Sequence, residues 1–420
     1  MTDTRKPVWS WLIVLVVAAL LTQTALNVVR PVTTYKLLDL GADPTVLGLI
    51  TAAYAVVPLA TALWFGRISD RVLDLRWLVA GGAGLLALGS VGLAVASNIP
   101  LVGLASALLG LGHLVFTIAG QASVARYAPA DRMNTGFGWF TAAYSAGQLI
   151  GPLIGGFLLG TETGSAAEGR SAGIAIALWV GALLALAAAP MMLIRSAAGP
   201  GRGRLEVEQL GPETGEEPAE TSGVPAGKAT LVGVLRVRGV ASHMLASLAL
   251  LAMLDILTAF LPLVGEAAGV SPAEVGILLA VRAMASISSR VFLPRLSLRY
   301  SARALLLLSL YGSGLALILP PLVITHVWAV VPLLILGGFC LGLGQPLTMT
   351  LVSMSVPESW RGAALAVRLT GNRAGQVVMP LVAGLIAAPL GAAGAIWFTC
   401  GVLLLSGWEK SVRSDPPPSG

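Results

Sequence analysis

Charged residues are scarce in this chain: they make up 11% of its 420 residues, against 56% that are hydrophobic. A water-soluble domain has about 25% charged residues, so the scarcity excludes an ordinary soluble domain. It indicates that most of the chain is surrounded by lipid. The 50 glycines fit this interpretation, because small residues let membrane helices pack closely.

Cysteine and the usual catalytic motifs are also lacking. Only Cys340 and Cys400 occur, each inside an apolar run, so we expect packing residues and no disulfide, metal or cofactor site. There is no HExxH motif, no Ser–His pair at a diagnostic spacing and no GxxxxGK[ST] phosphate loop. These absences argue against an enzyme and an ATP-driven pump. A receptor that does not transport is a minor alternative.

Basic residues exceed acidic ones, with a formal net charge of +6. They are spread over short loops between apolar runs instead of forming a patch, so we expect no nucleic-acid partner. If both termini are cytoplasmic, 20 of the 26 basic residues lie on the cytoplasmic side. Such a bias orients membrane proteins, and we therefore expect a multi-pass protein of the cytoplasmic (inner) membrane with both termini inside.

Twelve apolar segments are long enough to cross the bilayer, which takes about 20 residues each. They cover residues 9–34, 43–65, 77–97, 101–125, 136–159, 172–194, 240–264, 273–293, 303–323, 327–354, 362–388 and 391–408. A polar stretch rich in Glu, Pro and Gly, 196–238, divides them six and six and is typical of a disordered linker. The predicted organisation is an N-terminal bundle (1–195), this cytoplasmic linker, a C-terminal bundle (239–410) and a disordered tail (411–420).

The chain contains an internal repeat. AGQLIGPLIGG at 146–156 recurs as AGQVVMPLVAG at 374–384, an offset of 228 residues. The same offset relates Gly41 to Gly269 and Gly48 to Gly276 without a gap. The chain is therefore interpreted as a duplicated six-helix bundle, an architecture typical of secondary transporters with a central site between the halves.

The loop between the second and third segments adds a motif. It reads GRISDRVLDLR at 66–76 and resembles the G-x-x-x-D-R-x-G-R-R/K loop of the major facilitator superfamily, although Leu73 and Asp74 depart from that pattern. The resemblance covers essentially the whole chain. It implies an all-α integral membrane protein with twelve transmembrane helices in two pseudo-symmetric six-helix bundles. It also implies a gating role for this loop, carried by Gly66, Asp70, Arg71 and Arg76. A generic basic loop is the alternative.

The repeated phrase on the fifth segment resembles a second family signature, G-x-x-x-G-P-x-x-G-G, which is associated with proton-coupled exporters. Its matching residues are Gly147, Gly151, Pro152, Gly155 and Gly156. Small residues allow close helix contact, and proline bends a helix because it cannot donate to the helical ladder. An arginine that drug exporters of the family carry in the fourth segment is replaced here by Ser106, which weakens an assignment to ordinary drug–proton antiport.

Ionisable residues inside a membrane are costly and usually functional. Asp255 is the only carboxylate well inside a predicted segment. Apolar surroundings favour its protonated form, whereas a nearby guanidinium favours the carboxylate. We predict that Asp255 carries the coupled proton, with a fixed ion pair as the alternative. His113 is a second candidate proton carrier because histidine titrates near neutral pH, although a hydrogen-bonded packing role is the alternative.

Polar residues inside the segments are the candidates for substrate binding. Gln23, Asn27 and Arg30 share one face of the first helix, although Arg30 could instead extend to lipid headgroups. Three further arginines against a single aspartate favour an anionic substrate, because guanidinium pairs well with carboxylate and phosphate. The remaining candidates are Tyr54, Tyr144, Gln148, Arg282, Arg368, Asn372, Arg373 and Gln376.

These observations predict a secondary active transporter for a small organic molecule. The fifth-segment signature favours export in exchange for protons, whereas the excess of arginine favours the alternative, uptake of an organic anion together with protons. The expected partners are the substrate, protons and the lipid bilayer, and we expect a monomer.

Overall fold

A computed structural model describes residues 10–129, 132–160, 169–193, 231–237, 239–357 and 360–412. Within these ranges the regular structure is helical. The first half consists of α1 (Ser10–Asp39), α2 (Pro44–Arg71), α3 (Leu75–Val95), α4 (Ile99–Tyr127), α5 (Met133–Leu159) and α6 (Arg170–Leu193). The second half consists of α8 (Leu231–Arg236), α9 (Val240–Ala267), α10 (Pro272–Ser297), α11 (Ala302–Ala316), α12 (Pro320–Val323), α13 (Val327–Met354), α14 (Arg361–Leu390) and α15 (Ala393–Val412).

The predicted membrane segments correspond to these helices. Among the described residues, 11 helical segments are long and apolar enough to span a bilayer, with α11 and α12 counted as one. The twelfth predicted segment, 391–408, falls on the 20-residue helix α15, whose last turns contain Glu409 and Lys410. The prediction of a twelve-helix, all-α membrane fold is therefore confirmed, with one span interrupted between Ala316 and Pro320.

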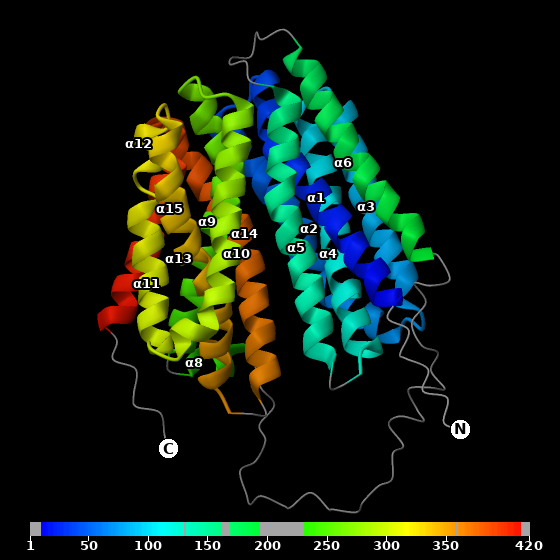
Figure 1. Cartoon of the computed structure of the whole chain (residues 1–420), viewed down its shortest axis with the longest axis vertical. Coiled ribbons are helices and arrows are strands. Elements are labelled where there is room, and N and C mark those ends of the chain that lie inside the picture. The colour runs from blue at the N-terminus through cyan, green and yellow to red at the C-terminus, as the bar shows by residue number, and fades with distance from the viewer. Residues whose placement is uncertain are drawn as a thin grey trace, which may run out of the picture.

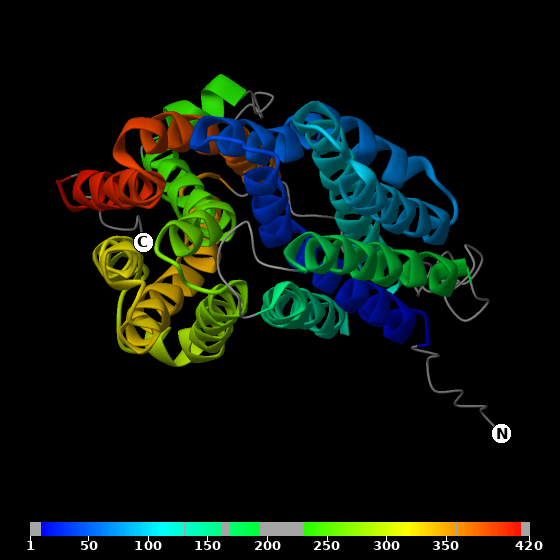
Figure 2. The ribbon, with the colours of Figure 1, turned by 90° about the horizontal axis from the view of Figure 1, so that it is seen from above.

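The two halves lie side by side, and each contains one copy of the repeat (Figures 1 and 2). At one end α2 packs along α14 and α5 packs along α10, while α1 and α9 meet between them. This end, where α1 turns into α2 and α9 turns into α10, is called the closed end below. Towards the opposite end, where α8 lies, the helices of the two halves diverge (Figure 1); this is called the open end.

Repeat-related turns define the closed end. Gly41 and Gly269 have φ angles of 74° and 72°, a left-handed conformation that glycine adopts without steric cost. Each turn is followed by a side-chain cap: Asp43 accepts a hydrogen bond at the start of α2, and Ser271 forms a capping box with Glu274 at the start of α10. The duplication therefore repeats the turn geometry as well as the helices.

Two pairs of glycines bring the halves into backbone contact at the closed end. A Cβ atom added to Gly48 on α2 would lie against the carbonyl oxygen of Pro380 and 3.0 Å from the Cα atom of Gly384 on α14. A Cβ atom added to Gly156 on α5 would lie 3.1 Å from the Cα atom of Gly276 on α10. The offset of 228 residues relates Gly48 to Gly276 and Gly156 to Gly384. The repeat thus forms the same glycine contact twice.

The predicted linker ends earlier than expected. Residues 231–236, assigned to it from the sequence, form α8, and Val234 is fully buried. Val234 belongs to a small apolar cluster with Met244 of α9 and Val352 of α13. The apolar letters LVGVL give this turn a face to bury, which the preceding glutamate-rich stretch lacks. Residues 196–230 and 413–420 lie outside the described part, so the remaining linker and most of the tail stay predictions.

The predicted gating loop is partly helical. Gly66 and Arg71 belong to the last turns of α2, so the loop proper is only the short connection to α3. Arg71 is exposed, Arg76 pairs with Asp74 (Nε–Oδ2 2.6 Å), and the side chain of Asp70 lies outside the described part.

An arginine of α4 stabilises this connection. Arg126 donates hydrogen bonds to the carbonyl oxygens of Ser69 (2.8 Å) and Val72 (2.6 Å), two of the carbonyls that a helix C-terminus leaves without partners. These contacts lie within the first half, at the open end. The gating role of the loop therefore stays a prediction.

Candidate functional site

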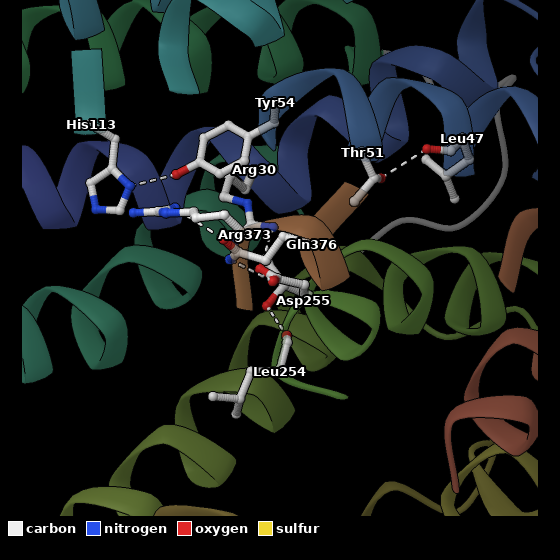
Figure 3. Close-up of polar contacts among 10 residues, drawn as sticks. Arg30, Leu47, Thr51, Tyr54, His113, Leu254, Asp255, Arg373 and Gln376 are labelled. Carbon is white, nitrogen blue, oxygen red and sulfur yellow. Dashed lines mark hydrogen bonds and ion pairs between the residues drawn. The ribbon is translucent and has the colours of Figure 1, made fainter. Parts of the chain in front are cut away.

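An ion pair joins the two halves near the middle of the molecule. The Nη2 atom of Arg30 on α1 lies 2.7 Å from Oδ1 of Asp255 on α9 (Figure 3). The side chains are 18% and 7% exposed, respectively. Buried charges are stable only when they are paired and hydrogen-bonded. The pair that the sequence left open as an alternative for Asp255 is therefore present, and it crosses the interface between the bundles.

Residues of α14 complete the surroundings of Asp255. Gln376 donates a hydrogen bond from Nε2 to Oδ2 of Asp255 (2.9 Å), and Arg373 donates from Nη1 to Oε1 of Gln376 (2.9 Å). Both carboxylate oxygens of Asp255 are thus bound, one from each half. Gln376 belongs to the repeated AGQ, so the second copy of the phrase supplies a partner for the carboxylate.

A polar chain extends from Arg30 into the first half. The guanidinium carbon of Arg30 lies 4.7 Å from the centre of the Tyr54 ring, a distance at which the cation is attracted by the aromatic face. The Tyr54 hydroxyl lies 2.6 Å from Nδ1 of His113. Arg373 runs towards His113 (Figure 3), and its charge acts on both His113 and Tyr54. His113 therefore belongs to the same network as Asp255.

The remaining candidates of the first half lie closer to the open end. The hydroxyl of Tyr144 lies 2.9 Å from that of Thr117, and Gln23 is buried, 2% exposed. Asn27 donates to the backbone of Gln23 (2.8 Å). Gln148 is half-buried and makes no side-chain hydrogen bond to the described residues. None of these residues forms a hydrogen bond with Asp255 within the described part of the chain, and the predicted substrate-binding role of this face of α1 stays a prediction.

The glycine motif of α5 explains how this polar face is held. A Cβ atom added to Gly147 would collide with the backbone between Gln23 and Thr24, 2.7 Å away, and one added to Gly151 would lie 2.7 Å from the backbone of Asn27. Gly155 faces Val28 at 3.3 Å. Three glycines of the motif therefore seat α5 on α1, while Gly156 and Pro152 face α10 across the interface.

Arg282 on α10 is a buried charge without a counterion in the described part of the chain. Its exposed fraction is 7%, and its Nε atom has no hydrogen-bond partner. Asp255 acts on it attractively, while Arg290 and Arg30 repel it. Arg30 is already paired to Asp255, so no carboxylate of the described residues forms an ion pair with Arg282.

The two arginines predicted on α14 differ in their surroundings. Arg368 is 6% exposed and donates from Nη2 to Oε1 of Gln345 (2.9 Å) and to the hydroxyl of Thr348 (3.2 Å), both on α13. Asn372 donates to the hydroxyl of Ser247 on α9 (3.1 Å). These contacts hold helices within the second half together, whereas Arg373 reaches across to the first half.

The sequence did not point to a second bridge between the halves, at the closed end. Arg170 at the start of α6 is 4% exposed and contacts Asp39 of α1 (Nε–Oδ1 3.2 Å) and Glu266 of α9 (Nη1–Oε1 2.5 Å). Its guanidinium also lies over the ring of Tyr35, 5.4 Å from its centre. These residues stand at helix ends, where charge is expected on membrane proteins, so composition gave no signal of the contact.

Two similar bundles of membrane helices with charged residues between them are typical of secondary transporters. The sequence profile of the Major Facilitator Superfamily matches residues 13–263 and 243–420. The chain belongs to this family, as its two motifs indicated, and is therefore a membrane transporter and not an enzyme.

Relatives with a known activity match only part of the chain. The quinolone resistance protein NorA of Staphylococcus aureus is 26% identical over 133 residues, which is 32% of this chain and 34% of NorA. The class B tetracycline resistance protein of Escherichia coli is 33% identical over 118 residues, which is 26% of this chain and 27% of that protein. The alignments thus span about a third or less of each relative.

Solved structures match over nearly the whole length. The nucleoside transporter NupG has a TM-score of 0.71 at 14% identity, with 96% of this chain and 98% of that chain covered. A bacterial homolog of the human lysosomal transporter Spinster, in an inward-facing and occupied conformation, has a TM-score of 0.73 at 14% identity, with 98% and 100% covered. At these identities the likeness establishes the fold alone.

Proposed function

We propose that this protein exports a small organic molecule across the cell membrane in exchange for protons, by rocking its two halves about the central site. The export direction is supported by the fifth-helix motif and by the partial resemblance to the two resistance proteins. In this orientation both termini are cytoplasmic and the closed end faces outward, as the distribution of basic residues favours.

The observation that carries the proposal is the bridge from Asp255 to both halves. As a carboxylate, Asp255 holds Arg30 of the first half and Gln376 of the second half. Protonation removes the negative charge that attracts Arg30, so the ion pair between α1 and α9 weakens. Protonation of Asp255 is thereby linked to the ion pair between the halves, which must change when the protein converts between its two conformations.

Electrostatic linkage between substrate and proton then decides the direction of coupling. A substrate group that is positively charged competes with the proton for Asp255, which gives exchange. An anionic group beside Asp255 instead favours the protonated carboxyl, so that substrate and proton bind together. This linkage is reciprocal, so its sign can be measured either as the effect of pH on substrate binding or as the effect of substrate on proton binding.

The test is transport in proteoliposomes under an imposed pH gradient, with a panel of cationic drugs, sugars and organic anions. We expect an acidic exterior to drive at least one compound out of the liposome lumen, because protons enter in exchange. The Asp255→Asn protein should keep counterflow, which needs only substrate exchange, and lose accumulation driven by the pH gradient. Accumulation that survives this substitution unchanged would show that Asp255 has a structural role only.

A second candidate function is uptake of an organic anion together with protons. The specific observation in its favour is Arg282, which is buried and has no counterion in the described part of the chain. In this case an acidic exterior drives the anion inward, opposite to the first proposal. The same liposomes therefore separate the two candidates by the sign of the flux.

A further inference from the structure

A pocket lies on the closed-end side of the central ion pair. It is bounded by α1, α2, α4 and α9, thus by both halves, and its empty volume of about 410 Å³ includes space open to solvent. Arg30 and Tyr54 form its boundary towards the central site, and the pocket continues from them to Leu37 and Leu47 near the closed end.

The hydrogen-bond donors in this pocket are few. Its threonines use their hydroxyl protons on backbone carbonyls: Thr34 donates to Ala259, Thr51 to Leu47 and Thr258 to Leu254. Thr33 donates in the same way within α1. The Tyr54 hydroxyl is engaged with His113. Among the described residues that line the pocket, the donors left are therefore the guanidinium of Arg30 and the hydroxyl of Ser106.

Arg30 has donors to spare. A guanidinium carries five N–H groups in a planar fork, and in the described part of the chain only Nη2 donates a hydrogen bond, to Asp255. The other edge of the fork is suited to a carboxylate or a similar oxyanion, which it binds with two parallel hydrogen bonds. Arg30 can thus hold Asp255 and a ligand oxyanion together.

Ser106 keeps the pocket open. It lies on α4, is 5% exposed and lines the pocket together with Leu109, Ile50 and Leu47. A long side chain at this position would occupy the volume beside Arg30, and a basic one would bring two positive charges together. The small residue at 106 therefore leaves room for a ligand, with apolar walls beside the cation.

We propose that this pocket is a ligand position distinct from the central site around Asp255, and that it takes the oxyanion-bearing end of a small organic molecule. The oxyanion pairs with the unoccupied edge of Arg30 and with Ser106, and an apolar body packs against Leu37, Leu47 and Ile50. As a step on the transport path the position rests on the second candidate function, uptake of an organic anion together with protons, because an anionic group beside Asp255 favours the protonated carboxyl. Ligand binding at this position can nevertheless be measured on the purified protein without a pH gradient.

The test is the reactivity of a thiol placed in the pocket. Ser106→Cys is introduced with Cys340→Ala and Cys400→Ala, so that no other thiol is present. The purified protein is treated with the anionic reagent 2-sulfonatoethyl methanethiosulfonate or the cationic 2-(trimethylammonium)ethyl methanethiosulfonate. Each rate is divided by the rate of that reagent with 2-mercaptoethanol. An effect of Arg30 on the thiolate fraction is common to both reagents and cancels in their ratio.

We expect the anionic reagent to be favoured by about tenfold or more, since a guanidinium at short range attracts one reagent and repels the other. Adding Arg30→Gln should abolish this preference, and 3-phenylpropanoate, but not phenethylamine, should slow the modification. The control is Ser123→Cys, also on α4 and 4% exposed but outside the pocket, which should react slowly with both reagents. A thiol at 106 as slow as this control, or one without preference, would overturn the pocket assignment whatever the transport assay shows.

Discussion

Arg30 and Asp255 bind each other across the interface of the two bundles, with 2.7 Å between Nη2 and Oδ1. Removing one partner leaves the other as an uncompensated buried charge, which typically costs about 3–5 kcal/mol of folding free energy. We expect Arg30→Gln and Asp255→Asn each to lower thermal stability in detergent, and the double substitution to cost clearly less than the sum. Strict additivity of the two losses would contradict a direct interaction.

The close approach of the glycines at the closed end predicts a conformational effect of one methyl group. Gly276→Ala places its Cβ atom against the backbone of Pro152 and Gly156, so α5 and α10 must separate. Overpacking costs about 1–3 kcal/mol, which shifts the ratio of the two conformations by about 5- to 150-fold. The closed end should open and the open end should close.

Spin labels at the open end measure this shift. Leu73 in the first half and Leu298 in the second are 70% and 87% exposed, and labels at these positions in a protein without Cys340 and Cys400 should move closer together in Gly276→Ala. The matched control is Gly84→Ala on α3, where an added Cβ atom meets nothing within 4 Å. An unchanged distance distribution in Gly276→Ala would mean that α5 and α10 can separate at the closed end without a change of the protein between its two conformations.

The sequence revealed the architecture because hydropathy, basic-residue bias and the 228-residue offset act over many residues. It also singled out Arg30, Asp255 and Gln376 as candidate site residues, since polar residues inside apolar helices are conspicuous. It could not reveal which of them meet. The contact of Arg30 with Asp255 depends on how two bundles dock, and the repeat pairs Asn27 with Asp255, not Arg30.

Two other features were hidden for different physical reasons. Arg170, Asp39 and Glu266 stand at helix ends, where charged residues are ordinary, and only the packing of α6 and α9 against α1 brings them together. Close helix contact was expected from the glycines of the α5 signature, but the sequence did not specify the partner, and Gly147 and Gly151 seat α5 on α1. Close approach depends on the neighbouring backbone, which a motif alone does not specify.

The Arg170 bridge predicts a second way to open the closed end. Arg170→Gln removes the charge that holds Asp39 of the first half and Glu266 of the second, and the two carboxylates then repel each other. The labels at Leu73 and Leu298 should therefore move closer, as in the glycine variant. Arg170→Lys should give an intermediate shift, because an ammonium lacks the planar fork that reaches two partners.

A control for this prediction is Lys36 at the end of α1, which donates a hydrogen bond to the carbonyl oxygen of Ala94 (3.0 Å) within the first half. Lys36→Gln removes a charge of the same sign at the closed end without removing a contact between the halves. It should leave the label distances unchanged. If Arg170→Gln behaves like Lys36→Gln, the bridge contributes nothing to the balance between the conformations.

The two arginines of α14 are expected to respond differently to the same substitution. Arg368 is held by Gln345 and Thr348 of α13, so Arg368→Gln should lower stability by about 1.5–3 kcal/mol, the typical contribution of a hydrogen bond to a charged group. Arg373 donates only to its helix neighbour Gln376 among the described residues, so Arg373→Gln should leave the unfolding temperature nearly unchanged.

If substrate oxyanions bind to Arg373, the Arg373→Gln variant should instead lose binding and transport of the organic anions in the liposome panel by about tenfold or more. Retained anion affinity in a stable Arg373→Gln protein would remove Arg373 from the binding site, and a stable Arg368→Gln protein with lost affinity would put Arg368 there in its place.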